Sequence, residues 1–380
     1  MNLTKTSAFV KKFFKYLGLF VGSYYLLTLF IFPGSVAIFK AIFVKSVPYN
    51  TIYGQLDQLK FVQKNIKSTN PEVILDTPNG KLPTNLPDRM KVYKFKPQQY
   101  SYLAGTNTIE EARKLGFTEE NLISDLKGTV YSWKNSVTSS TLTIDINSRK
   151  LKLETNLTGK ASYFTSGSID KETAVATAKQ KLTSIYRFND DLYPKGTQEV
   201  ALANFSGNRI KEATETNRAQ IAMVDFYRSV EDFPILGEDP SKGLLRIVVR
   251  KQSGKLNPMD NPLIEADYWE IESTTKSSYP IISVKQAWDS VSEGKGIITS
   301  VEPKNLDAFE NYSPVQIDKI YIDEISLAYY ETPEYQTHLQ PIYVFSGTYN
   351  TRGSEGGTIT IYYPSITAEF IKINGQETRQ

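Results

Sequence analysis

The sequence predicts an α+β protein in which an N-terminal transmembrane helix is followed by tandem modules, each with a helix packed on an antiparallel sheet. Two observations support this fold class. An uncharged, apolar stretch lies near the start of the chain, and a capped amphipathic helix followed by alternating strands recurs three times after it. The helices are too few to cover both faces of a parallel sheet, so a helix on one face of an antiparallel sheet is the expected arrangement.

The apolar stretch is long enough to cross a bilayer. No residue from Tyr16 to Phe39 is charged, and a spanning helix needs about 20 apolar residues. We therefore expect a transmembrane anchor at 13–44. Lysines crowd residues 1–15, so the positive-inside rule predicts a cytoplasmic tail at 1–12 and an extracytoplasmic body held at the cell membrane by a single pass. A cleaved signal peptide is the alternative, but its apolar core would be shorter.

Composition excludes several function classes. The chain has 44 basic and 41 acidic residues and a net charge of +3, which argues against a nucleic-acid partner. Cysteine is absent, so disulfides, thiolate zinc sites and cysteine nucleophiles are excluded. One histidine, His338, is too few for a multi-histidine metal site. We therefore expect no cofactor.

A Pro-rich stem with short strands is expected at 45–100. Strand patterns occur at 73–77 and 90–96, and the prolines between them prevent long helices. The prolines of this stem are Pro48, Pro71, Pro78, Pro83, Pro87 and Pro97.

The first helix–sheet module is expected at 101–165. Thr108 and Glu111 have the spacing of a capping box, which predicts a helix that begins there and ends at Phe117. Alternating strands follow from Val130 onward.

The second and third modules are expected at 166–277 and 278–380. The second begins with a helix at Ser168 or Asp170, in which apolar residues recur every three or four positions. The third begins with a helix at Ser283, and Gly294 stands where a helix C-cap belongs. Strands complete both modules.

Two of these helix openings resemble the PepSY-like modules of bacterial extracytoplasmic proteins, and especially the membrane-anchored YycH/YycI-type regulators. The matching segments are SIDKETAVATAKQKL at Ser168–Leu182 and ISVKQAWDSVSEGKG at Ile282–Gly296, and the resemblance extends roughly from Ser168 to Phe370. It implies a regulatory module without catalytic residues that binds another protein or domain. The chain departs from the usual Asp-Ala-x-Thr-Gly turn of such modules, with only Gln252-Ser253-Gly254-Lys255 in its place.

The motifs of common enzymes are absent or incomplete. His338 has no partner motif, and we expect it in a solvent-facing loop. Ser-x-x-Lys occurs at Ser124–Lys127 and at Ser273–Lys276, but the companion motifs of penicillin-binding enzymes are missing. Acidic pairs such as Glu231-Asp232 lack the spacing of a calcium loop, so solvated loop charges are the favoured interpretation. A pair of carboxylates for glycoside hydrolysis stays open, because their separation is not visible in a sequence.

Tyrosines concentrate in the third module and are candidates for a partner-binding patch if they lie on an outward face. The alternative, which we favour, is that they are ordinary strand residues and partly in the core. The candidates are Tyr329, Tyr330, Tyr335 and Tyr343.

The sequence therefore predicts a non-enzymatic, single-pass membrane protein whose extracytoplasmic modules bind and regulate an envelope protein. Its partners are then the lipid bilayer, through the N-terminal helix, and that envelope protein. A membrane-anchored cell-wall hydrolase or transpeptidase is the alternative from another function class. An enzyme requires a cleft with converging ionisable groups, whereas a binding protein requires a surface that fits its partner.

Overall fold

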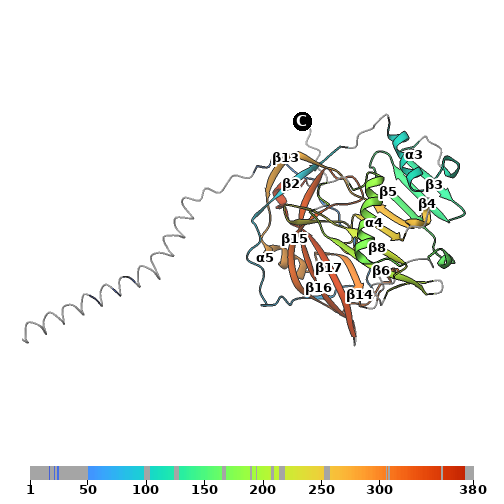
Figure 1. Ribbon diagram of the computed structural model, residues 1–380. Coiled ribbons are helices and arrows are strands. Elements are labelled where there is room, and N and C mark those ends of the chain that lie inside the picture. Colours follow the sequence, from blue (N-terminus) through green and yellow to red (C-terminus); the bar gives the residue numbers. More distant parts are fainter. Residues whose placement is uncertain are drawn as a thin grey trace, which may run out of the picture. The chain divides into compact units, whose positions relative to one another are not determined.

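Strands dominate the computed structural model, and they form an eight-stranded and a nine-stranded sheet (Figure 1). Contacts divide the chain into two units, Met1–Tyr49 and Asn50–Gln380, and the sheets belong to the second. The residues that the structure describes are 17, 21, 24, 50–97, 103–123, 128–164, 168–188, 191–193, 195–206, 209–213, 219–251, 257–304, 306, 309–351 and 354–372.

The eight-stranded sheet, here called the antiparallel sheet, has the order β3-β4-β5-β12-β11-β8-β6-β7, and all its neighbouring strands are antiparallel. Its helices are α3 (Ala104–Lys114) and α4 (Lys171–Ser184). The strands are β3 (Val130–Asn135), β4 (Ser140–Asp145), β5 (Leu151–Thr155), β6 (Gln198–Ser206), β7 (Arg209–Glu212), β8 (Ile221–Phe226), β11 (Leu245–Arg250) and β12 (Leu263–Ala266).

Helix α4 begins and packs as its sequence predicts. Asp170 is the N-cap, and its side chain accepts a hydrogen bond from the backbone N–H of Thr173 at 2.8 Å. Ala174, Ala178 and Leu182 are buried and lie in one core cluster with β8 and β11. Their spacing of four residues places them on one helix face, which covers the sheet.

The start of helix α3 differs from the expectation. The helix begins at Ala104 after the N-cap Leu103, and Thr108 and Glu111 lie inside it, both buried. Glu111 does not cap the helix, because its carboxylate accepts a hydrogen bond from Arg187 at 2.6 Å. The predicted capping box is therefore wrong, and a tertiary ion pair takes its place.

The nine-stranded sheet, here called the mixed sheet, is centred on β15 and β16. β1 and β10 pair with β15 in parallel, whereas the other pairs are antiparallel. The strands are β1 (Glu72–Leu75), β2 (Arg89–Phe95), β9 (Arg228–Val230), β10 (Phe233–Leu236), β13 (Ile271–Pro280), β14 (Ile297–Pro303), β15 (Lys319–Tyr330), β16 (His338–Thr351) and β17 (Ser354–Pro364).

Helix α5 (Val284–Ser292) packs against β1 and β17 of the mixed sheet. Ser283 and Gln286 form a capping box at its start. Gly294 follows its end with a φ of +79°, a conformation that glycine adopts without steric cost. The predicted start and end of this helix are confirmed. The described part of the chain also includes 3₁₀-helices at Glu119–Asn121, Ala161–Phe164, Pro258–Asp260 and Ala368–Phe370.

Residues 50–68, here called the strap, run along the mixed sheet in place of the expected stem. The strap is fixed at Leu56, whose backbone N–H donates to Phe370 O at 2.8 Å, and at Lys64, whose N–H donates to Ile298 O at 2.7 Å. Leu59 and Phe61 pack on a cluster of β15, β16 and β17 side chains. The strap therefore covers part of the sheet that would otherwise face water.

The two sheets are nested in the sequence. Every strand of the antiparallel sheet lies between β2 and β13, two neighbouring strands of the mixed sheet. The hairpin of β9 and β10 leaves this inserted region and joins the mixed sheet beside β15. The chain thus enters the antiparallel sheet after β2, leaves it at Tyr227, returns to it between β10 and β11, and leaves it again at 267–270.

A buried ion pair lies at this junction, on the mixed-sheet side. Arg228 of β9 pairs with Glu331, which follows β15, and neither side chain is exposed to solvent (0% each). Arg228 Nη1 also donates to Trp269 O at 3.0 Å, and the backbone N–H of Trp269 donates to the Glu331 carboxylate. These bonds join β9, β15 and the segment that enters β13.

The fold class is therefore corrected to a mainly β structure. The expected tandem modules do not occur. Strands of the first two expected modules combine in one antiparallel sheet, while β9, β10 and β13 of the second and β1 and β2 of the expected stem join the strands of the third in the mixed sheet. The expected anchor at 13–44 lies outside the described residues except for Leu17, Val21 and Tyr24. None of the helices described is both long and apolar enough to cross a membrane, so the expected membrane-spanning helix is not borne out. The predicted extracytoplasmic location is not tested and stays a prediction.

Candidate functional site

A groove of about 890 Å³ lies between the two sheets, and we call it the inter-sheet groove. One side is formed by Met223 and Asp225 of β8 and by Arg246 of β11. Their strand neighbours Ala222 and Val224 pack with α4, so the groove lies on the face of the antiparallel sheet opposite the helices. The other side is formed by β14 and by parts of β16 and β17. Its volume is typical of a large ligand pocket.

A buried ion pair forms part of this wall. Arg246 Nε donates to Asp225 Oδ1 at 2.7 Å, and its Nη2 donates to Oδ2 at 3.0 Å. The backbone N–H of Gly243 adds a third bond to Oδ1 at 2.8 Å. A Cβ at Gly243 would lie only 2.8 Å from the backbone N and O of Phe226, so glycine permits this close approach.

Burial raises the pKa of Asp225, and the attraction of Arg246 offsets only part of that rise. For Arg246, burial lowers the pKa, but the charge and hydrogen bonds of Asp225 together with the charge of Glu265 raise it above its usual value. The two-point geometry fixes both side chains in one orientation. They form a rigid polar floor rather than mobile groups.

The strap contributes Lys64 to the groove. Its ammonium lies 2.9 Å from Asp239 Oδ2 and 4.9 Å from the centre of the Tyr312 ring. Burial alone would raise the pKa of Asp239, but hydrogen bonds from Lys64 and Ser241 outweigh it and lower the pKa. Lys64, Asp239 and Tyr312 also line a smaller cavity of about 360 Å³. They therefore lie between that cavity and the inter-sheet groove.

Carboxylates outnumber cations in the lining of the groove. Asp225 and Asp239 are neutralised by Arg246 and Lys64, which leaves the surplus with the remaining acidic side chains. A surplus of one charge sign in a concave site attracts ligands of the opposite sign. The charged lining residues are Glu199, Glu212, Asp225, Asp239, Glu302, Glu310, Lys64, Lys242, Arg246 and Lys304.

Asp225, the buried carboxylate of the groove, accepts two hydrogen bonds from Arg246 and one from the backbone N–H of Gly243, so its orientation is fixed. His338 does not line the groove. Among the residues that the structure describes, no three acidic or histidine side chains form a metal-binding group.

The motifs considered as possible chemistry lie elsewhere. Ser273–Lys276 is on strand β13, and Ser124–Lys127 lies outside the described residues. His338 begins strand β16, is partly buried, and its Nδ1 lies 2.8 Å from Thr337 Oγ1. Its ring packs on Tyr53 of the strap with a centroid distance of 4.6 Å. The expected solvent-facing loop is therefore wrong for His338. Glu231 and Asp232 form the turn between β9 and β10, and both have positive φ angles.

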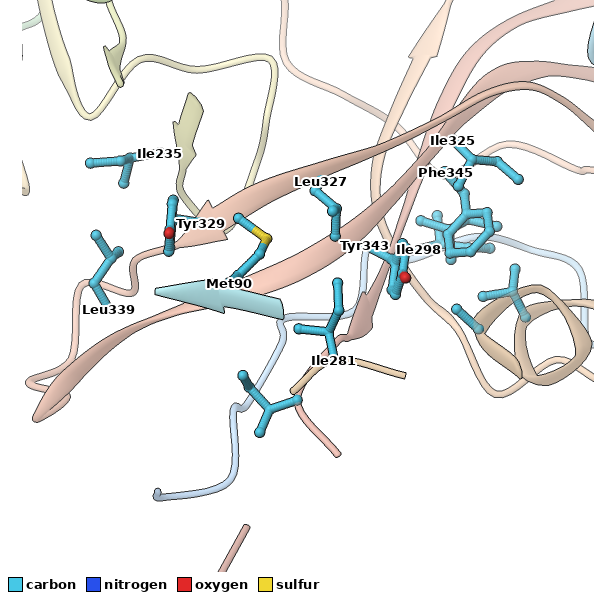
Figure 2. Packing of buried hydrophobic residues seen from close by; sticks show 14 of the residues in the cluster. Met90, Ile235, Ile281, Ile298, Ile325, Leu327, Tyr329, Leu339, Tyr343 and Phe345 are labelled. Atoms are coloured by element: carbon cyan, nitrogen blue, oxygen red, sulfur yellow. The ribbon is translucent and has the colours of Figure 1, made fainter. Parts of the chain in front are cut away.

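The structure does not bring the four candidate tyrosines together as a surface patch. Tyr329, Tyr330 and Tyr343 are at most 1% exposed, and Tyr335 is 43% exposed. The three buried hydroxyls donate to backbone carbonyls of Lys91, Lys60 and Ile282 at 2.7–3.0 Å. Figure 2 shows Tyr329 and Tyr343 among apolar side chains of the core.

Tyr335 is the one candidate that a partner could reach. Its ring packs edge-on against Trp269, with centroids 5.2 Å apart. Trp269 belongs to the junction between the sheets, so Tyr335 lies beside that junction and not in the groove.

Sequence reasoning missed Asp225 and Arg246. A signal was present, because each stands inside an apolar strand, in IAMVDF and LRIVVR. A charge at such a position is usually paired when buried.

Comparison with known proteins gives little further information. No protein-family model matches the chain, and no curated protein matches it. A crystal structure of an uncharacterized protein from Eubacterium rectale ATCC 33656, at 1.45 Å resolution, is weakly similar. It has 12% sequence identity and a TM-score of 0.40, and the match covers 73% of this chain and 82% of that chain. The resemblance to PepSY-like regulators stays a prediction.

Proposed function

We propose that this chain is a non-enzymatic binding protein that holds an extended, positively charged segment of another polypeptide in the inter-sheet groove. The observation that carries this proposal is the surplus of carboxylates around the fixed Asp225–Arg246 pair in a groove of about 890 Å³. Such a pair gives a ligand backbone fixed hydrogen-bonding positions, while the outer carboxylates attract its basic side chains. That the partner is an envelope protein stays a prediction.

Two labelled peptides of equal length test the proposal, one of alternating lysine and alanine and one of alternating glutamate and alanine. We expect the lysine peptide to bind in fluorescence anisotropy and its affinity to fall as salt is added, because salt screens exposed charges. The glutamate peptide should not bind. Equal binding of the two peptides would contradict the proposal.

Variants locate the binding. Glu199→Gln and Glu310→Gln remove exposed carboxylates of the groove, and each should weaken the lysine peptide about two- to fivefold, as expected for rim charges. Glu154→Gln is the matched control, because Glu154 is an exposed carboxylate of the antiparallel sheet that does not line the groove. Equal losses in all three variants would show that the peptide binds by net charge alone.

A parallel assay addresses the alternative enzyme class. The purified chain is incubated with cell-wall fragments, and new reducing ends or released peptides are measured. We expect no release above a heat-denatured control. Release that is abolished by Glu199→Gln or Glu310→Gln would overturn the binding proposal in favour of a hydrolase.

A further inference from the structure

The strap places one of its own lysines in the inter-sheet groove. Among residues 50–68, all of which the structure describes, only Lys64 lines the groove. Residues 57–66 form neither helix nor strand, and Lys60 and Lys67 stand on either side of Lys64 in the sequence. The strap is therefore itself a segment of the kind that we propose as the ligand, a basic stretch of polypeptide without regular secondary structure.

Side chains from two loops receive the Lys64 ammonium. Its Nζ lies 2.9 Å from Asp239 Oδ2 and 4.9 Å from the centre of the Tyr312 ring. The other carboxylate oxygen, Asp239 Oδ1, accepts a hydrogen bond from Ser241 Oγ at 2.8 Å, which fixes the carboxylate in place. We call Asp239, Ser241 and Tyr312 the ammonium site. A fixed carboxylate beside an aromatic face attracts an ammonium of any origin, not only that of Lys64.

The backbone of the strap is fixed independently of the Lys64 side chain. The backbone N–H of Lys64 donates to Ile298 O at 2.7 Å, and the Tyr312 hydroxyl donates to Asn65 O at 2.7 Å. The side chains of Lys64 and Asp239 are 24% and 18% exposed, so solvent reaches their ion pair, and such pairs contribute little to stability. Rotation of the Lys64 side chain alone therefore opens the ammonium site while the strap stays in place.

The smaller cavity of about 360 Å³ gives an incoming lysine room beside the ammonium site. Lys64, Asp239 and Tyr312 line both this cavity and the inter-sheet groove, so the Lys64 side chain lies between the two spaces. When that side chain turns away, a lysine that enters from the groove has space for its aliphatic stem and reaches Asp239 with its ammonium.

We propose that Lys64 is an internal competitor of the bound polypeptide: a lysine of the ligand takes the ammonium site, and the Lys64 side chain turns out of it. This inference rests on the proposed function, because it concerns the same groove. Lys64 is covalently attached and therefore has a high effective concentration at the site. A foreign lysine displaces it only when the rest of its segment also binds the groove, which makes the groove selective for segments over single cations. The competing explanation is a structural ion pair that stays intact in the complex.

Fluorescence anisotropy with the lysine–alanine peptide measures the competition. Lys64→Met keeps the aliphatic stem but removes the competing ammonium, and it should tighten peptide binding about three- to tenfold. Lys242→Met is the matched control, because Lys242 is an exposed cation in the lining of the same groove, and it should tighten binding less than about twofold. Equal gains in the two variants would show a general effect of charge and overturn the proposal. Unchanged or weaker binding to Lys64→Met would overturn it as well.

A double-mutant cycle tests whether the competition takes place at Asp239. In an Asp239→Asn background, Lys64→Met should change the affinity by less than about 1.5-fold, because the carboxylate for which the two ammonium groups compete is gone. A gain that persists in this background would contradict the exchange. If Asp239→Asn fails to fold, the comparison of Lys64→Met with Lys242→Met decides.

A small cation separates failure of this inference from failure of the proposed function. Lys64→Ala removes the side chain beyond Cβ, and propylammonium replaces the lost atoms. Propylammonium chloride at about 50 mM, compared with sodium chloride at the same concentration, should raise the thermal midpoint of Lys64→Ala by about 1–2 °C and leave that of the wild type unchanged. Equal shifts in both proteins would overturn the ammonium site. A lysine peptide that binds neither the wild type nor Lys64→Met would contradict the proposed function and the competition with it, whatever propylammonium does.

Discussion

The environment of a single side chain in this protein is formed by residues that are far apart in the sequence, and His338 is the clearest example. Its ring lies against Tyr53 of the strap, and Asp57, Lys94 and Lys372 surround it electrostatically. Burial lowers the pKa of His338, the two lysines lower it further, and Asp57 offsets part of the effect. This environment therefore favours the neutral form of the imidazole over its charged form.

This environment predicts how stability depends on pH. The pKa of His338 is below its unfolded value of about 6.5, so the folded state binds fewer protons than the unfolded state when the pH falls through this range. The free energy of unfolding should therefore decrease as the pH falls from about 7.5 to about 5.5. Urea unfolding at the two pH values measures the change, and the His338→Gln variant should show a smaller one.

The titration of His338 can also be observed directly. The chain has one histidine, so one imidazole signal in the proton NMR spectrum reports its pKa without assignment. A midpoint at or above about 6.5 would contradict the effect of burial.

At the scale of strands and helices, the junction between the sheets depends on the Arg228–Glu331 pair. Both side chains are fully buried, and removal of one partner leaves a charge without compensation. Glu331→Gln should therefore lower the free energy of unfolding by about 3–5 kcal/mol. Chemical denaturation measures this change.

Two further variants make this test specific. The double variant Arg228→Met with Glu331→Gln should be more stable than Glu331→Gln alone, because it no longer contains an unpaired buried cation. Glu154→Gln removes one side of the exposed Lys152–Glu154 pair, whose atoms lie 3.1 Å apart, and should change stability by less than about 1 kcal/mol. If Glu331→Gln cost no more than Glu154→Gln, the junction would not depend on this pair.

Elements were predictable where their signals are local. The caps at Asp170 and Ser283 and the glycine at Gly294 lie within one turn of the helix ends that they determine, so α4 and α5 follow from the sequence. The start of α3 did not, because Glu111 pairs with Arg187, which lies after α4 in the chain. A local pattern cannot show that a side chain has a distant partner.

Sheet membership and the groove were not predictable for the same reason. Strand alternation identifies a buried face but not the neighbouring strand, and β2 pairs with β13 across the whole inserted sheet. Tyr330 seemed able to face outward, but Phe61 of the strap covers it with ring centroids 4.8 Å apart. The inter-sheet groove combines residues of both sheets and the strap, so it exists only after all of these have packed.

For the molecule as a whole, the strap acts as part of the core of the mixed sheet. Phe61 packs edge-on against Tyr330 and Tyr362, with centroids 4.8 and 5.7 Å apart. Phe61→Ala should lower the free energy of unfolding by about 2 kcal/mol, less than for a fully buried ring because Phe61 is partly exposed. Hydrogen exchange should become faster in β15, β16 and β17.

The neighbouring residue provides the control for the strap. Val62 is 49% exposed, so Val62→Ala should change stability by no more than about 0.5 kcal/mol and leave hydrogen exchange in these strands unchanged. If the two variants behaved alike, the strap would lie on the mixed sheet without stabilising it.

The nested order of the sheets also has a consequence for synthesis on the ribosome. β1 and β2 emerge early, but their partners β15 and β13 follow only after the entire antiparallel sheet has been made. At about 5–20 residues per second, the chain from Phe95 to Ile271 takes on the order of 10 s or longer to translate. During this time two strands have unpaired edges. Pro71, Pro78, Pro83, Pro87 and Pro97 stand beside these strands, and prolines there hinder premature pairing with other nascent chains.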